Sequence, residues 1–150
     1  MDYEADFYAW TQAQAAALRQ VATLRPNLGA EIDWEHLADE VESMGNSEKH
    51  EIASRLEVLL AHLLKLALTR HIDPRHGWVR TAREQRDRIN DRLTTSPSLR
   101  RHAADVLAES YRRARRSFLS EYAVETTPTT CPFDLEREIL ADEWFPPEPG

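Results

Sequence analysis

Residues 56–68 read LEVLLAHLLKLAL, the most apolar stretch of this 150-residue sequence. From Val58 to Leu68 only His62 and Lys65 interrupt the apolar run, which is too short to span a bilayer. A helix that is apolar on nearly all sides is usually covered by neighbouring elements from several directions. We therefore expect this stretch to form the central helix of a helical core.

Apolar residues recur at three- and four-residue spacing before this stretch, which predicts two helical segments there. The first segment begins near Asp6, a suitable N-cap, and its apolar stripe is Phe7, Trp10, Ala13, Ala17, Val21 and Leu24. Pro26 and Gly29 end it. The second segment begins after Asp33, and its stripe is Trp34, Leu37, Val41 and Met44. We expect both stripes to face the core.

Gly45 is the ambiguous position in this pattern. Beyond it the stripe resumes almost in phase as Ile52, Leu56, Leu59, Leu63 and Leu66. Residues 33–70 are therefore either one kinked helix or two helices, the second capped by Asn46 or Ser47. The pattern leaves both interpretations open.

Three further helical segments follow the core stretch. Residues 78–93 carry an amphipathic pattern, and Ser96-Pro97 is a start signal for a helix over residues 99–122. Asp134 can cap a short helix over residues 135–140, after a linker that contains Pro128. No alternating pattern long enough for a strand occurs.

These segments predict an all-α fold class. We expect residues 1–150 to form one single-domain helical bundle of about five main helices, because this length suits one core. An extended C-terminal segment should pack over its surface, and residues 146–150 should form a loose tail.

The formal net charge is −7, and it is unevenly distributed. Residues 1–70 carry −6, residues 71–120 carry +6 and residues 121–150 carry −7. A basic helix pair that lies against acidic segments of the same fold explains this alternation more simply than a nucleic-acid site does. Weak nucleic-acid binding through the Arg-rich helices is therefore the third of three functional hypotheses, after the two given below.

Cysteine content and the first residues indicate the compartment. Cys131 is the only cysteine, which excludes an internal disulfide. Residues 1–6 carry three acidic and no basic side chains, which a signal peptide would not. We expect a cytoplasmic protein that does not enter a membrane.

Several motifs occur in order from about residue 3 to residue 146. They are DFYAWTQ at 6–12, WEHLADEVESMGNSE at 34–48, HLLK at 62–65, Trp78 with Thr81, Gln85 and Arg86, SPSL at 96–99, Tyr111 with Ala114, CPF at 131–133 and WFP at 144–146. Together they resemble the bacterial family catalogued as domain of unknown function 29. The resemblance implies a compact all-helical domain with no agreed biochemical activity. The sequence departs from the family pattern at residues 70–77.

A polar cluster is the most specific site that the residues suggest. Its candidate members are Glu40, Glu48, Arg55, His62, Arg83 and Arg86. Arg86 follows Trp78 and Ala82 at four-residue spacing, which aims it at the core. We expect Arg86 to pair with Glu48 or Glu40, with His62 nearby, bonded to a carboxylate or a carbonyl. The cluster is then either architectural or a pocket for an anionic ligand.

Other chemistry finds little support. The paired Glu-x-x-His pattern of a di-iron bundle is absent, although a zinc site from His36, His62 and His102 cannot be judged from spacing. Cys131 has no assignable base, and no glycine-rich phosphate loop occurs. We therefore predict no catalytic residue, no metal and no cofactor.

The favoured function is a non-enzymatic interaction or regulatory module that uses a helical face. The partner is an unknown protein, and a homo-oligomer is compatible with the sequence. The alternative is a helical-bundle enzyme or small-ligand binder that uses the polar cluster.

Overall fold

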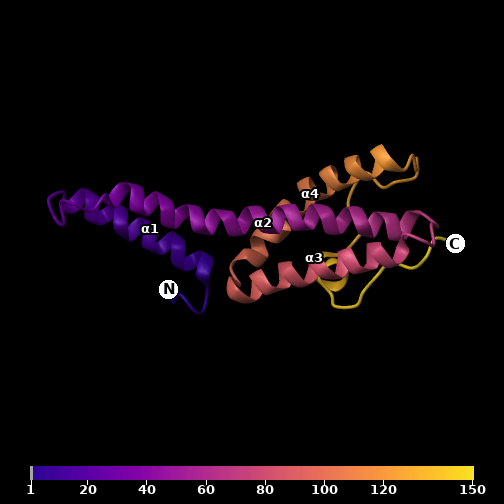
Figure 1. Cartoon of the computed structure of the whole chain (residues 1–150), viewed down its shortest axis with the longest axis horizontal. Coiled ribbons are helices and arrows are strands. Elements are labelled where there is room, and N and C mark those ends of the chain that lie inside the picture. Colours follow the sequence, from indigo (N-terminus) through magenta and orange to yellow (C-terminus); the bar gives the residue numbers. More distant parts are fainter. Residues whose placement is uncertain (1) are drawn as a thin grey trace. The chain divides into compact units, whose positions relative to one another are not determined.

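The computed structural model describes residues 2–150 and is all-α over that range (Figure 1). Its elements are α1 (Phe7–Leu24), α2 (Trp34–Leu68), α3 (Arg75–Thr95), α4 (Leu99–Glu121) and the π-helical turn η1 (Leu135–Ile139). The predicted fold class of about five helices is confirmed.

α2 is continuous through Gly45, where the sequence left open whether there is one helix or two. It is one helix of 35 residues, so Gly45 does not end it. No proline lies between Pro26 and Pro74, so each backbone N–H in this range can donate to the helical ladder. Gly45 instead permits a close approach of α1, because a Cβ there would overlap the hydroxyl of Thr11.

The chain divides into two compact units. The first comprises the residues up to His50 together with Arg92–Arg100, and the second comprises Glu51–Asp91 and Arg101–Gly150. α2 contributes its first half to one unit and its second half to the other. The single domain over residues 1–150 stays a prediction.

The second unit contains the predicted central stretch as its core. The leucines of α2 that are fully buried there are Leu56, Leu59, Leu60, Leu63, Leu64 and Leu66. α3 adds Ala82 and Ile89 to this core, and α4 adds Ala114 and Phe118, all at 0% exposure. The prediction of a helix covered on several sides is confirmed.

The first unit buries other residues than the pattern predicted. Leu24 is 75% exposed, Leu37 43% and Met44 48%. The buried positions of the two helices are instead Thr11, Ala15, Ala38 and Gly45. Small side chains let two helix backbones approach closely, so α1 and α2 pair through their smallest residues and the larger apolar side chains lie outside the contact. The expectation that both stripes face the core is wrong for these residues.

Asp6 joins the N-termini of α1 and α4 within the first unit. Its Oδ1 accepts from Ala9 N at 2.8 Å, which caps α1 as predicted, and from the Ser98 hydroxyl at 2.9 Å. Its Oδ2 accepts from Ser98 N at 2.7 Å. Ser96 Oγ accepts from Tyr8 N at 3.0 Å, so it serves α1, whereas the sequence suggested that it would cap its own helix. Each helix start therefore supplies a cap to the other.

The C-terminal segment packs within the second unit, to which it belongs. Asp134 caps η1 by accepting from Arg137 N at 2.7 Å, as predicted. Before η1, the Tyr111 hydroxyl donates to Pro128 O at 2.6 Å. After it, Pro146 is buried. The loose character of residues 146–150 stays a prediction.

Gly45→Ala should lower the free energy of unfolding, because overpacking usually costs about 1–3 kcal/mol. The added methyl would overlap Thr11 Oγ1, which is itself held by a 2.7 Å bond to Tyr8 O. The helix propensity gained over glycine offsets about 1 kcal/mol of this cost, so the net loss should be up to about 2 kcal/mol. Urea unfolding of the full chain measures the change.

Gly77→Ala is the matched control, because a Cβ at Gly77 meets nothing within 4 Å. It should leave the protein equally stable or slightly more stable. Equal behaviour of the two variants would contradict the close approach at Gly45.

Candidate functional site

Arg86 is the most deeply buried member of the predicted polar cluster, at 1% exposure. Its Nε donates to Ile139 O and its Nη2 to Trp144 O, both at 2.7 Å. Its guanidinium also lies 5.0 Å from the centre of the Phe145 ring. Burial lowers the pKa of Arg86, because the charged form loses solvation. The predicted core-side position is confirmed, but backbone carbonyls take the place of the expected carboxylate partner.

These carbonyls explain what Arg86 does. Ile139 is the last residue of η1, where helical carbonyls lack partners within the helix. Asn90 lies one turn further along α3, and its Nδ2 donates to Leu140 O at 3.0 Å. Arg86 and Asn90 therefore fasten the C-terminal segment to α3.

Arg83 and Arg55 make separate contacts in the second unit. Arg83 pairs with Glu143 at 2.9 Å on the surface and lies 5.5 Å from the Phe145 ring centre. Arg55 pairs with Glu51 at 3.1 Å and donates to the Gln85 side chain at 3.1 Å. The structure therefore brings Arg83 and Arg86 together at Phe145, whereas Arg55 binds other partners.

The two predicted carboxylates belong to the first unit. Glu48 is half-buried and pairs with Arg92 at 3.5 Å. Glu40 is exposed on α2. Glu48 thus has the cationic partner that a half-buried carboxylate needs, but that partner is Arg92 and none of the predicted arginines.

His62 has the carbonyl partner that the sequence analysis allowed. Its Nδ1 lies 2.8 Å from Val58 O, one turn earlier in α2. Burial lowers the pKa of this half-buried imidazole, which favours its neutral form at pH 7. His62 is then a donor to its own helix, which is a structural role.

Arg86→Ala should lower the free energy of unfolding by about 3 kcal/mol, because the buried Ile139 carbonyl and the part-buried Trp144 carbonyl would lose their donor, and a buried group left unpaired costs about 1–3 kcal/mol. Proteolytic cleavage at residues 139–145 should become faster as the segment detaches. Arg83→Ala removes only an exposed ion pair and should lower the free energy of unfolding much less. If urea unfolding shows similar losses of stability for the two variants, Arg86 does not fasten the C-terminal segment to α3.

The feature that sequence analysis missed is an exposed apolar face on the helical hairpin of α1 and the first half of α2. We call it the hairpin face and define it by Ala17, Val21 and Leu24 of α1 and Leu37, Val41 and Met44 of α2. Five of the eight exposed large apolar side chains described lie between residues 24 and 44. Val21 and Val41 are half-buried between them.

Contacts on one edge of the hairpin show where this face lies. Arg19 bridges Asp39 at 2.9 Å and Glu42 at 2.5 Å, and the Lys49 ammonium lies 4.9 Å from the Tyr8 ring centre. Figure 1 shows α1 and this half of α2 side by side. Helical geometry puts the two apolar stripes on the opposite edge from these charged contacts, on the same side of both helices. The hairpin thus has one closed polar edge and one open apolar edge.

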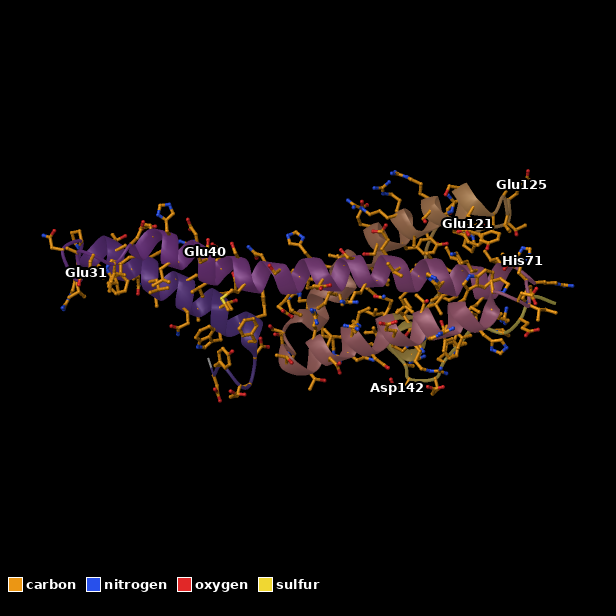
Figure 2. The ribbon with its side chains drawn as sticks, viewed as in Figure 1. Glu31, Glu40, His71, Glu121, Glu125 and Asp142 are labelled. Carbon is orange, nitrogen blue, oxygen red and sulfur yellow. The ribbon has the colours of Figure 1, made fainter. Side chains whose placement is uncertain are left out.

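The surroundings of the hairpin face are acidic. Residues 1–50 contain ten acidic and three basic side chains, a formal charge of −7. Figure 2 shows Glu31 in the turn of the hairpin and Glu40 along α2. Among the residues described, Glu31, Glu35 and Glu40 form no ion pair.

An apolar cavity of about 400 Å³ lies in the second unit. Leu64, Phe133, Trp144 and several prolines line it, and its ionisable residues are Glu138 and Glu148. Catalytic and ligand sites usually combine an apolar cavity with several converging polar groups. This cavity has few polar groups in its lining.

Metal and thiol chemistry receive no support from the residues described. Residues 2–150 contain no group of three or more His, Cys, Asp and Glu side chains placed to hold a metal ion. Cys131 is half-buried against Phe133 O, and burial raises the pKa of its thiol. A raised pKa disfavours the thiolate, which is the nucleophilic form.

Three arginines of the densest run, Arg112, Arg113 and Arg115, have partners within the chain. Glu109 accepts from Arg112 at 2.6 Å and from Arg113 at 3.1 Å, and these bonds lower the pKa of its carboxyl to about 2. Arg115 donates to Pro128 O at 2.9 Å. One carboxylate does not neutralise four arginines, so the weighing of internal charge matching against nucleic-acid binding stays a prediction.

The Glu109 carboxyl should titrate at a pKa of about 2 in carbon-detected NMR of the full chain. In Arg112→Gln the titration should move toward the usual value for glutamate, because one of the two cationic donors is lost. Arg101→Gln, on the same helix, should leave the Glu109 titration unchanged. A Glu109 carboxyl with an ordinary pKa in the unaltered chain would show that the two arginines are free for other partners.

The comparisons with known proteins agree with this fold. The model of the family described as domain of unknown function DUF29 matches residues 3–145. A crystal structure of an alpha-helical protein of unknown function from Rhodospirillum rubrum is similar with a TM-score of 0.81 and 23% identity, over 96% of this chain and 92% of that one. The search of curated proteins found no match. In the described part of the chain, no helix has the length and apolar character needed to cross a membrane.

Proposed function

We propose that this chain, which belongs to the DUF29 family, is a non-enzymatic module that binds another protein through the hairpin face. The observation that carries the proposal is the exposure of Leu24, Leu37 and Met44 in stripes with the spacing of a buried helix face. Clustered apolar surface of this kind commonly marks an interaction site. The alternative of an enzyme or ligand binder receives less support, because two of the three guanidinium nitrogens of Arg86 donate to backbone carbonyls and only the buried Nη1 has no partner among the residues described.

An α-helix is the partner element that suits this face. Two antiparallel helices with apolar stripes on one side form a groove that a third helix can fill. Leu37, Val41 and Met44 recur at four- and three-residue spacing, so a partner helix with the same spacing can interdigitate with them. Ala17 provides a low point on α1 where a larger partner side chain can pack.

Charge selects among partner helices. The −7 charge of residues 1–50 attracts a helix with lysine or arginine beside its apolar stripe. Glu40 on α2 and Glu31 in the turn are unpaired in the described structure and are available to such cations. A second copy of the chain would bring a second −7 charge to the same place, so we propose a basic amphipathic helix of another protein.

The bacterial cytoplasm is the setting that we propose for this module. The bacterial source of the similar crystal structure supports a bacterial origin. The single cysteine fits a reducing compartment, because the chain cannot form an internal disulfide.

A displayed library of amphipathic helical peptides, selected on the full chain, tests the proposal. Recovered peptides should carry apolar residues at helical spacing flanked by lysine or arginine. They should bind the double variant Leu37→Lys with Met44→Lys at least about tenfold more weakly, because burying one leucine side chain contributes about 1.5–3 kcal/mol. Fluorescence anisotropy of the labelled peptides measures the affinities.

Val58→Lys is the matched control, since Val58 is 38% exposed on the same helix but lies in the second unit. It should bind the peptides as the unaltered chain does. Recovered peptides that keep their affinity for the double variant, or that carry acidic flanks, would overturn the proposal. So would sedimentation showing a dimer that the double variant abolishes, which would identify a second copy as the occupant.

A further inference from the structure

The connection between α2 and α3, residues 69–74, forms a cationic cavity in the second unit, separate from the hairpin face. The cavity measures about 380 Å³, and its lining consists of Arg70, His71, Ile72, Arg75, Glu148 and Pro149. Two guanidinium groups and one imidazole therefore line a single small space. Figure 2 shows His71 at this end of α2.

The side chain of Arg75 is held in position by contacts within the protein. Its side chain is only 20% exposed, and its Nη1 donates to Leu66 O at 3.2 Å. Leu66 lies in the last turn of α2, where carbonyls lack helical partners, so this bond also completes the helix end. The rest of the guanidinium remains able to donate to a planar oxyanion.

His71 is fixed by aromatic neighbours. Its ring lies 5.6 Å from the Tyr122 ring and 6.4 Å from the Trp78 ring, centre to centre. Trp78 is itself buried, so this packing holds the imidazole at the cavity wall. Arg70 is exposed beside it and forms no ion pair with the residues described. The cavity therefore holds one unmatched cation.

The chain already places a carboxylate in this cavity. Glu148 lies 3.5 Å from Arg75 Nε, and its side chain is 77% exposed. An exposed ion pair of this kind contributes little and exchanges readily with solvent. Glu148 thus shows which chemistry the cavity accepts, and its weak hold leaves the cavity open to competition.

We propose that this cavity is a binding site for an oxyanion, a carboxylate or phosphate group, with Glu148 as an internal competitor. Arg75 and Arg70 bind the anion, and His71 contributes a ring nitrogen. The proposal is independent of the hairpin face, because none of its residues belongs to the first unit.

Titration of the full chain with inorganic phosphate and, separately, with acetate tests the site. The backbone amide shifts of residues 70–77 are followed by NMR at low ionic strength, where weak charge interactions are least screened. We expect at least one anion to shift these amides with saturation in the millimolar range. Glu148→Gln should tighten binding by about threefold, because the site no longer divides its time between two ligands.

Arg70→Gln should weaken binding by about tenfold or more, and it tests the site without disturbing the fold because Arg70 is exposed. Arg113→Gln removes an arginine elsewhere in the second unit and should bind as the unaltered chain does. The anion that binds identifies the source as carboxylate or phosphate. The proposal is overturned if neither anion shifts residues 70–77, if Arg70→Gln keeps full affinity, or if Glu148→Gln leaves the affinity unchanged.

Discussion

The structure depends on the uninterrupted hydrogen-bond ladder of α2. One helix over Trp34–Leu68 supplies the α1 partner in the first unit and the leucine core of the second. The ladder continues because no proline falls within it and because Gly45 keeps helical geometry while it admits Thr11. A helix with two different surroundings along its length also explains why one apolar stripe is buried in its second half and uncovered in its first.

The helices and the core of the second unit could be predicted, because both depend on local spacing and on the density of leucines in one stretch. The pairing of α1 with α2 could not be predicted, because Ala38 and Gly45 give no strong apolar signal. They allow the pairing because they have little or no side chain. A seven-residue interval links Ala38, Gly45, Ile52, Leu59 and Leu66, and small residues on that interval were the available clue. Hydropathy alone favours the neighbouring stripe.

The polar cluster shows a different limit of sequence analysis. A buried arginine demands acceptors, and the side chains that the sequence displays suggest carboxylates. The acceptors of Arg86 are the backbone carbonyls of Ile139 and Trp144, more than fifty residues away. Because every residue has a backbone carbonyl, the sequence does not single out these two. The burial of Arg86 was predictable from its helical position, whereas its partners follow from the path of the C-terminal segment.

The exchange of caps between α1 and α4 has a consequence for synthesis on the ribosome. Tyr8 N has no Ser96 hydroxyl to donate to until Ser96 has been synthesised. The second carboxylate oxygen of Asp6 likewise lacks its donor, Ser98 N, which lies 92 residues later. The start of α1 is therefore completed only after the beginning of α4 has emerged. During that interval the N-terminus of α1 in the nascent chain lacks two hydrogen bonds that the finished protein contains.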